Sequence, residues 1–469
     1  MSAGQDNPLR KVHFTGVCGT AMGSLAAALR DRGVEVTGSD DNVYPPMSTF
    51  LESKGIAIRK GFSPDNIPSD ADFVVIGNAM SRGNPEVEAV LNRKLLYYSL
   101  PEALKIFFLR GRHNLVVAGT HGKTTTTSML AWIFQSAGLA PSWLIGGIPN
   151  NLGQGCRLGE SKYFILEGDE YDTAFFDKRS KFVHYLPELL VVNNIEFDHA
   201  DIFRDLEDVM TSFRRLVAIV PSEGMVLLNA DDPNCRALAE KCPAPWVEVG
   251  FSPDAGNQIR DVHYGRDSSA FTLFGQRFEL PMIGEFNVRN AAMAVSAAHF
   301  YQVPLEEIGK ALQTFTGIRR RQEVRGEAGG VTVVDDFGHH PTAIAQTIEG
   351  LRVKFPTGKL WAIFEPRSNT TRRAVFQEVL PKAFTRADGV VLAQVARVDQ
   401  LPPDQRLDPE KVVSDLRRDG KEAFYEADTA AIVSRAVGLA GRGDVIVVFS
   451  NGGFDNIHSK LLEALEAEG

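Results

Sequence analysis

The stretch that decides the fold of this chain is Val116-Val117-Ala118-Gly119-Thr120-His121-Gly122-Lys123-Thr124-Thr125, in which an apolar run leads into a glycine-rich turn. The pattern of residues 128–135 after the turn is helical. Glycines in such a turn let backbone amides converge on phosphate oxygens, and the N-terminus of the next helix adds a favourable dipole. Lys123 would then reach the β- and γ-phosphates of a nucleotide, while the Thr124 hydroxyl would hold Mg²⁺.

This loop differs from the usual P-loop at one position. The usual loop has a glycine five residues before its second glycine, and this chain has Val117 there, so the loop is the shorter GTxGKT form. The alternative is an ordinary strand–helix turn that contains Gly-Lys-Thr, and the preceding strand argues against it. The predicted nucleotide-binding residues of the loop are Gly119, Thr120, His121, Gly122, Lys123, Thr124 and Thr125.

Short β-branched runs recur along the chain, and each is followed by a turn and a helical pattern. Continuous apolar strands that alternate with helices predict an α/β fold with parallel sheets covered on both faces. The clearest strands are predicted at Val12–Thr15, Phe73–Ile76, Leu115–Ala118, Leu189–Val192, Thr332–Val334, Leu360–Phe364, Val390–Leu392 and Val445–Phe449.

The strands fall into three series, which predict three domains. A chain of 469 residues exceeds one ordinary core. The first series ends near the polar stretch Arg110–His113, which suits a linker, and the second ends at the basic cluster Arg319–Arg321. We therefore expect domains at residues 1–112, 113–322 and 323–469.

Composition indicates a cytoplasmic enzyme. Hydrophobic residues make up 44% and charged residues 23%, and the net charge of −9 argues against binding to nucleic acid or to an anionic membrane. The polar start Met1–Pro8 lacks the apolar core of a signal peptide, and no apolar run approaches the roughly 18–20 residues that span a bilayer. The four cysteines form no CxxC pair, which fits a reducing compartment. The oligomeric state is not predicted.

Two strand ends near the P-loop carry carboxylates. Residues 164–172 end in Glu-Gly-Asp-Glu-Tyr-Asp, and residues 191–199 end in Glu-Phe-Asp-His. Taken alone, these are as well explained by a solvated acidic turn and a structural histidine. Together, in the same sheet as a P-loop, they favour a metal-assisted phosphoryl-transfer site.

The N-terminal segment contains a second glycine-rich turn. Residues 14–23 read FTGVCGTAMG, a helix follows, and Gly38-Ser39-Asp40 comes after the predicted strand Val34–Thr37. This arrangement is similar to the dinucleotide fingerprint, in which glycines admit a pyrophosphate and an acid at a strand end meets a ribose hydroxyl. NAD and UDP share the pyrophosphate–ribose unit, so this turn fits either of them.

The order of GTHGKTT, EGDEYD, NIEFDH, GEFNVRN, RRR and DDFGHHP resembles the Mur ligase family along essentially the whole chain. The resemblance implies a Rossmann-like N-terminal domain that binds a UDP-sugar, a central P-loop ATPase domain with a parallel sheet, and a Rossmann-like C-terminal domain that binds the acceptor. It also implies an ATP-dependent ligase, which activates a carboxylate as an acyl phosphate and lets an amine displace the phosphate.

The family motifs assign roles to particular residues. Lys123, Glu167 and His199 are the implied catalytic residues, and Thr124, Glu167 and His199 are the implied ligands of Mg²⁺ or Mn²⁺. The other ATP contacts implied are Asn287 and Asn290 near adenine, and Arg321 and Asp336, which the C-terminal hinge and domain bring over the nucleotide. The implied UDP-sugar site comprises Gly16, Gly19, Thr20, Met22, Gly23, Ser39 and Asp40.

Within the family, the GxCGTxMG turn resembles that of members that act on bare UDP-N-acetylmuramate. Residues 39–52, 76–91, 170–185, 196–203 and 364–372 resemble the members that join it to the tripeptide L-Ala-γ-D-Glu-meso-diaminopimelate in peptidoglycan recycling. Arg367, Ser368 and Asn369 are then the expected acceptor-binding residues, because an Arg-Ser-Asn edge can bind the carboxylates of a peptide. The members that add L-alanine in de novo peptidoglycan synthesis are the alternative.

Two other classes compete with a ligase. An NAD-dependent oxidoreductase would explain the N-terminal glycines but not Gly122-Lys123-Thr124. A non-catalytic nucleotide-binding regulator would not need Glu167 and His199 at strand ends.

Overall fold

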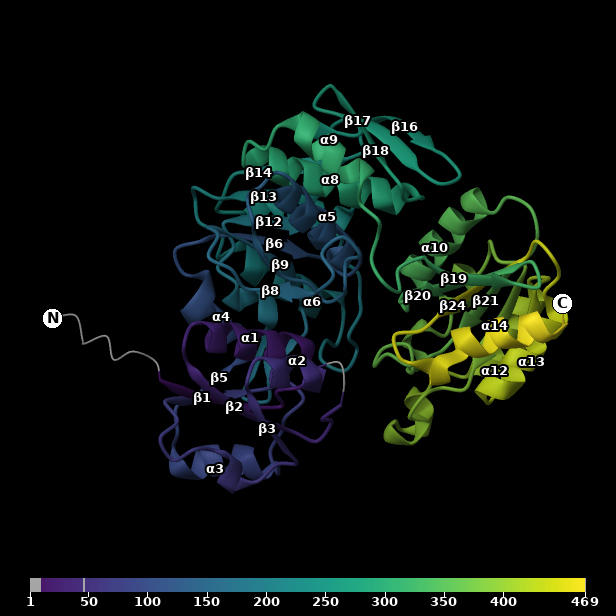
Figure 1. Ribbon diagram of the computed structural model, residues 1–469. Helices are drawn as coiled ribbons and strands as arrows, with labels where there is room; N and C mark the ends of the chain where they lie inside the picture. Colours follow the sequence, from purple (N-terminus) through teal and green to yellow (C-terminus); the bar gives the residue numbers. More distant parts are fainter. Residues whose placement is uncertain (1–9, 45–46, 469) are drawn as a thin grey trace.

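The computed structural model describes residues 10–44 and 47–468 and contains three α/β units that follow one another along the chain (Figure 1). The polar start Met1–Pro8, and Pro45 and Pro46 within the family-like stretch 39–52, lie outside the described residues. No helix in the described part of the chain combines the length and the apolar character that crossing a membrane requires.

The first unit is built on a five-stranded parallel sheet in the order β3-β2-β1-β4-β5. This order is that of a doubly wound fold, in which strands are added on one side of β1 up to β3 and then on its other side from β4. The strands are β1 (Lys11–Thr15), β2 (Glu35–Asp40), β3 (Ala57–Lys60), β4 (Phe73–Ile76) and β5 (Tyr97–Ser99), and the helices are α1 (Thr20–Asp31), α2 (Met47–Ser53), α3 (Pro85–Arg93) and α4 (Leu100–Leu104).

The central unit has an eight-stranded sheet in the order β15-β14-β13-β12-β6-β9-β7-β8, which is parallel except for the β7–β8 pair. Its strands are β6 (His113–Ala118), β7 (Ser142–Leu144), β8 (Cys156–Arg157), β9 (Tyr163–Gly168), β12 (Leu189–Val192), β13 (Met225–Asn229), β14 (Trp246–Gly250) and β15 (Asn257–Gln258). Its helices are α5 (Lys123–Ser136), α6 (Leu206–Val217), α7 (Pro233–Ala237), α8 (Glu285–Phe300) and α9 (Leu305–Gln313).

Two small antiparallel sheets in the central unit were not predicted. They are the hairpin of β10 (Asp172–Ala174) and β11 (Asp177–Ser180), and the sheet of β16 (Arg260–Tyr264), β17 (Ser269–Leu273) and β18 (Gln276–Leu280). Phe274 and Gly275 join β17 to β18 and both have positive φ, at 52° and 74°. A two-residue turn of this kind matches the twist of a hairpin. The Phe-Gly pair between two runs of alternating polar and apolar residues was therefore the feature of the sequence that could have indicated this hairpin.

The third unit has a six-stranded sheet in the order β19-β20-β24-β21-β22-β23, in which only β19 is antiparallel to its neighbour. Its strands are β19 (Glu323–Ala328), β20 (Val331–Asp336), β21 (Leu360–Phe364), β22 (Gly389–Ala393), β23 (Glu422–Glu426) and β24 (Val445–Phe449). Its helices are α10 (Pro341–Lys354), α11 (Leu380–Ala383), α12 (Pro409–Arg418), α13 (Thr429–Leu439) and α14 (Ile457–Glu468).

The predicted α/β class and all eight predicted strands are confirmed, with two corrections to local boundaries. His113 is the first residue of β6 rather than part of a linker, because its backbone N–H donates to Lys162 O at 2.8 Å. The predicted strand Val34–Thr37 is in fact β2, which runs on to Asp40. Gly38-Ser39-Asp40 is therefore the end of the strand and not the turn after it. The domain boundaries stay predictions.

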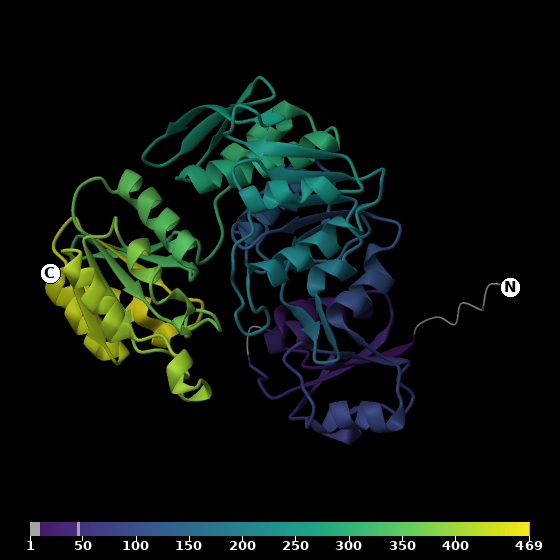
Figure 2. The same ribbon diagram turned by 180° about the vertical axis from the view of Figure 1, so that it is seen from behind.

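The three units are joined in different ways. One cluster of buried apolar side chains runs from the first unit into the central unit, and includes Leu25 and Phe164. The two buried apolar clusters of the third unit contain only residues of that unit, within the described part of the chain. Figure 2 shows the third unit beside the central one. Hydrogen bonds from Asn369 to Asp201 and from Thr370 to Asp198 join it to the central unit, and no buried apolar cluster of the described residues spans the two. An interface without a shared apolar core permits relative motion.

Candidate active site

Strand β6 lies in the middle of the central sheet, between β12 and β9. Val117 pairs in register with Glu167 on β9, and Ala118 pairs with Val192 on β12. Because these strands are parallel, the loops that follow all three meet at one edge of the sheet, where α/β proteins bind ligands. This edge is the candidate active site.

The P-loop glycines are required by the close approach of neighbouring backbone and side chains. Gly119 and Gly122 have φ values of +138° and +77°. A Cβ on Gly122 would lie 2.4 Å from Oδ1 of Asn290, and a Cβ on Gly119 would lie 3.1 Å from the backbone of Asn194. Helix α5 begins directly after Gly122, and no side chain in the described residues caps its N-terminus. The loop therefore presents the free start of a helix to a ligand, as a phosphate site requires.

Lys123 lies inside this loop, and its ammonium group is fully engaged. Nζ donates to Gly119 O at 2.6 Å and contacts the Glu170 carboxylate at 2.7 Å. Burial would lower the pKa of Lys123, but the attraction of Glu170 and Asp169 outweighs burial and raises the pKa. The side chain is therefore a fixed cation at neutral pH.

Glu167 forms a second pair at the same edge. The Thr124 hydroxyl donates to Glu167 Oε1 at 2.8 Å, and the Gly146 N–H donates to Oε2 at 2.6 Å. Burial raises the pKa of Glu167, against these two hydrogen bonds and the charges of Lys123 and Arg321. The predicted neighbours Thr124 and Glu167 are thus brought together.

His199 lies next to Glu170, a residue that the sequence had not assigned to the site. Its Nε2 is 3.2 Å from Glu170 Oε1, and Asp169, Glu170 and His199 offer ligand atoms within 4.8 Å of one another. Burial would lower the pKa of His199, but the Glu170 carboxylate outweighs it and raises the pKa to about 9. Glu170 was missed as a site residue, although it lies in the acidic strand end that contains Glu167.

Of the four residues predicted near adenine and above the nucleotide, only Arg321 lines the cavity of about 250 Å³ between the central and third units, and Asn290 lies against Gly122 of the P-loop instead. Ile283 and Gln322 line the cavity together with Arg321. Asn287 donates to Ile283 O at 2.8 Å, and its Oδ1 has no hydrogen-bond partner among the described residues. Asp336 accepts from the Gln322 and Gly338 N–H groups, and burial raises its pKa.

The glycine turn of the first unit surrounds the N-terminus of α1. Gly16 has a φ of +87°, Gly19 is the N-cap residue of α1, and Thr20 is its first residue. A Cβ on Gly23 would lie 2.5 Å from Met47 Sδ. Met22 is buried in the core, with 6% of its surface exposed, so it supports the turn rather than facing a ligand.

Ser39 and Asp40 hold the same turn by hydrogen bonds. The Cys18 N–H donates to Asp40 Oδ2 at 2.9 Å, and the Gly16 N–H donates to Ser39 O at 2.9 Å. Ser39 Oγ donates to the buried carboxylate of Glu86 at 2.6 Å. That carboxylate, which the sequence did not single out, also accepts from Thr15 Oγ1 at 2.8 Å.

We predict that Glu86→Ala destabilises the first unit by about 3–5 kcal/mol, because it leaves the donors around a buried carboxylate unpaired. Burial would raise the pKa of Glu86, but hydrogen bonds from His13, Ser39 and Asn66 outweigh it and lower the pKa below 4.5. A lowered pKa contributes stability above pH 4.5 that is lost as the pH falls through the folded-state pKa.

Urea denaturation at pH 7 and at pH 4 measures both effects. The matched control is Glu88→Ala, two residues further on, whose exposed pair with Arg82 should matter far less. Equal destabilisation by the two variants would contradict a special role for Glu86.

The predicted acceptor residues follow β21 in the third unit. Arg367 is 40% exposed at its side chain and pairs with Glu365 at 3.1 Å. Ser368 is engaged locally, with its Oγ 2.9 Å from Thr371 Oγ1. Asn369 reaches the central unit and donates to Asp201 at 2.8 Å. The arginine is therefore the member of this group best placed to bind a further carboxylate.

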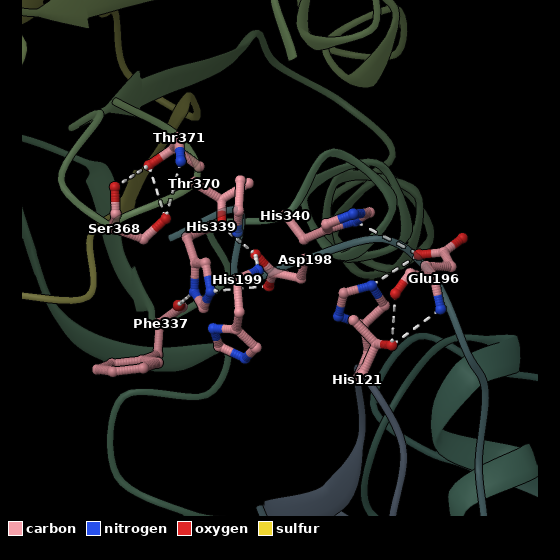
Figure 3. A network of polar contacts seen from close by, with 12 residues as sticks. His121, Glu196, Asp198, His199, Phe337, His339, His340, Ser368, Thr370 and Thr371 are labelled. Atoms are coloured by element: carbon pink, nitrogen blue, oxygen red, sulfur yellow. Dashed lines mark hydrogen bonds and ion pairs between the residues drawn. The ribbon is translucent and has the colours of Figure 1, made fainter. Parts of the chain in front are cut away.

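Polar contacts between the central and third units converge beside the P-loop (Figure 3). Thr370 Oγ1 donates to Asp198 Oδ1 at 2.6 Å, and His339 Nε2 lies 3.6 Å from Asp198 Oδ2. A separate group consists of His121, Glu196 and His340. Of His121, Glu196 and His340, only His121 was predicted to bind a ligand, although Glu196 lies in the acidic strand end 191–199 and His340 in the DDFGHHP motif.

Three family models match consecutive parts of the chain. They are "Mur ligase family, catalytic domain" at residues 11–112, "Mur ligase middle domain" at 117–298 and "Mur ligase, glutamate ligase domain" at 320–452.

The chain is also similar to known proteins over nearly its full length. It is 44% identical to the UDP-N-acetylmuramate–L-alanyl-γ-D-glutamyl-meso-2,6-diaminoheptandioate ligase of Escherichia coli (strain K12), over 97% of this chain and 98% of that ligase. It is 34% identical to the UDP-N-acetylmuramate–L-alanine ligase of Rubrobacter xylanophilus, over 97% of this chain and 100% of that ligase. The crystal structure of a murein peptide ligase from Psychrobacter arcticus superposes with a TM-score of 0.71 at 36% identity, covering 97% of this chain and 99% of that one.

Proposed function

This chain belongs to the Mur ligase family, and we propose that it joins UDP-N-acetylmuramate to the tripeptide L-Ala-γ-D-Glu-meso-diaminopimelate in peptidoglycan recycling. The observation that carries this proposal is the 44% identity to a ligase named for that reaction, against 34% to an alanine-adding ligase. The reaction forms a C–N bond and consumes ATP, with release of ADP and phosphate. Because ATP and UDP-sugars are cytoplasmic metabolites, we propose a cytoplasmic reaction.

The site residues fit a nucleotide and a hard divalent cation. The cradle at Gly119 and Gly122 has no room for a Cβ, which leaves the backbone amides free to approach phosphate oxygens. Two groups of donors lie at this edge: Thr124 with Glu167, and Asp169 and Glu170 with His199. Their oxygens are of the kind that Mg²⁺ prefers, and the His199 nitrogen is one that Mn²⁺ accepts readily. The cavity that Arg321 lines lies between the central and third units, where it could receive part of the nucleotide.

We assign one substrate to each unit. Residues 1–112 would bind the UDP-sugar at the Gly16–Gly23 turn, residues 113–322 would bind ATP, and residues 323–469 would bind the acceptor. Lys123 would neutralise the charge that builds on the γ-phosphate as the muramyl carboxylate attacks. Closure of the third unit over the nucleotide would bring Arg321 and Asp336 into place and exclude water from the acyl phosphate.

The experiment that tests this function compares two acceptors. The protein is incubated with ATP, Mg²⁺ and UDP-N-acetylmuramate, and ADP release and product mass are measured with the tripeptide or with L-alanine. We expect product with the tripeptide and little ADP when no acceptor is present. Preference for L-alanine would replace the proposal with the alanine-adding activity. Absence of any ligation, with nucleotide binding intact, would point to a regulator.

We predict that Glu167→Gln and His199→Gln each raise the Mg²⁺ concentration needed for half-maximal activity, because the first removes a negative charge and the second an imidazole nitrogen from the cation site. The measurement is the rate of ADP release over a Mg²⁺ titration. A matched control is His299→Gln, on the last turn of α8, at the opposite end of that helix from Asn287 and Asn290. Unchanged Mg²⁺ dependence with a shifted pH profile in His199→Gln would make His199 a proton carrier instead.

A further inference from the structure

The second cluster of metal-ligating side chains lies outside the proposed Mg²⁺ site and joins two units of the protein. His121 and Glu196 come from the loops after β6 and β12 of the central unit, and His340 is the N-cap residue of α10 in the third unit. His121 Nε2 is 2.7 Å from Glu196 Oε2, and His340 Nδ1 is 3.4 Å from the same oxygen. Figure 3 shows both imidazole rings directed at this carboxylate.

Hydrogen bonds fix the tautomer of His340. Its Nε2 lies 3.2 Å from the backbone oxygen of Phe197, and a carbonyl oxygen can only accept, so Nε2 carries the hydrogen. Nδ1 then has a lone pair, which faces Glu196 Oε2 and receives one long hydrogen bond of 3.3 Å from the Thr342 N–H. His340 Nδ1 and Glu196 Oε2 are then two acceptors 3.4 Å apart, an arrangement that a cation between them would stabilise.

The outer contacts resemble those of a metal site. Metal-binding histidines commonly donate their second ring N–H to a carbonyl, and ligating carboxylates are themselves hydrogen-bonded. Here Phe197 O takes the N–H of His340, and the Thr342 hydroxyl donates to Glu196 Oε1 at 3.0 Å.

We propose that His121, Glu196 and His340 bind a divalent transition metal of the zinc type and that this ion fastens the third unit to the P-loop. Two imidazoles and one carboxylate are a zinc ligand set, and Mg²⁺ would disfavour the two nitrogens. At zinc bond lengths, ligand atoms are about 3.3 Å apart, close to the His340–Glu196 distance. The ion would replace the proton between His121 Nε2 and Glu196 and release it to solvent. Glu196 is 35% exposed at its side chain, so an ion can reach it.

The same ion should slow turnover. The apolar clusters of the third unit do not extend into the central unit among the described residues, and hydrogen bonds such as those from Asn369 to Asp201 and from Thr370 to Asp198 cross the interface. A ligand bridge across that interface opposes the opening that releases products. Zn²⁺ would therefore inhibit this enzyme, and a chelator would restore its rate.

The test is metal binding to the chelator-stripped full-length protein in excess Mg²⁺. Co²⁺ is titrated and followed by its visible ligand-field absorption, and Zn²⁺ is then added as a competitor. We expect one site in the wild type that is weakened at least 100-fold in His340→Gln and in Glu196→Gln, and about 10- to 100-fold in Thr342→Val, which alters only an outer contact. The matched control His339→Gln should keep the site, because His339 lies outside the cluster.

Two further measurements separate this site from the catalytic one. His199→Gln should keep the Co²⁺ absorption. If His199→Gln loses this absorption while His340→Gln keeps it, the proposal is overturned. The rate of ADP release with stoichiometric Zn²⁺, divided by the rate without Zn²⁺, should be below one in the wild type. In Thr342→Val the same ratio should be near one at the same Zn²⁺ concentration. Circular dichroism checks that each variant folds, and if His340→Gln does not, Glu196→Gln and Thr342→Val decide. Equal Zn²⁺ affinity in the wild type and the folded ligand variants would exclude the site.

Discussion

Lys123→Ala should lower the rate of ADP release by about 10³-fold or more, which is the scale of losing one electrostatic stabiliser of a transition state. The reason lies in the position of its ammonium group. Nζ is held within 2.7 Å of Glu170 and 2.6 Å of Gly119 O, so it does not need to be ordered when charge develops on a phosphate. Initial rates at saturating ATP, UDP-N-acetylmuramate and tripeptide measure the effect.

The control for this variant is another lysine of the same sheet. Lys162 precedes β9, at the opposite end of the strand from Glu167, and its Nζ lies 4.9 Å from the ring centroid of Tyr163. Lys162→Ala should retain nearly full turnover. Near-normal ADP release by Lys123→Ala would exclude Lys123 as the phosphate cation. Because Lys123 also neutralises Glu170, thermal melting of the variant must show that the loss is not one of folding.

Arg367→Ala should raise the KM for the tripeptide by about 10- to 100-fold, since a bidentate pair with a carboxylate contributes roughly 1.5–3 kcal/mol. The guanidinium lies on the loop after β21, with one nitrogen 3.1 Å from Glu365 and 40% of the side chain exposed. It is thus held in position by Glu365 while keeping donors free for the diaminopimelate end of the peptide. The KM values for ATP and UDP-N-acetylmuramate should barely change, because we assign those ligands to the other two units.

Two companion variants sharpen this result. Arg367→Lys should recover only part of the affinity, because an ammonium group cannot reproduce the planar fork. Arg435→Ala removes a comparably exposed arginine on α13, paired with Glu426 at 2.9 Å, and should leave the tripeptide KM unchanged. Normal use of tripeptide by Arg367→Ala would remove this residue from the acceptor site.

Much of the fold could be predicted from the sequence because its signals are local. A buried parallel strand is a short continuous run, and Leu189–Val192, Leu360–Phe364 and Val445–Phe449 were predicted with their final boundaries. The α5 helix was recognised only from Ser128, although it begins at Lys123, because the propensity of a Lys-Thr-Thr run for helix is weak. The antiparallel strands β16 and β18 were missed because they are short and mostly exposed, and β17 between them is buried but only five residues long.

The sequence by itself determined the class of the protein: a P-loop after a buried strand, acidic strand ends in a fixed order, and a second glycine turn near the start. Only the tertiary structure decided which of these residues meet. Glu170 rather than Glu167 contacts Lys123 and His199, because β9 ends at Gly168 and the chain then turns towards the P-loop. Glu196 contacts both His121 and His340, and His340 lies 144 positions after Glu196 in the chain. Such contacts depend on strand register and on the packing of one unit against another, and a linear pattern contains neither.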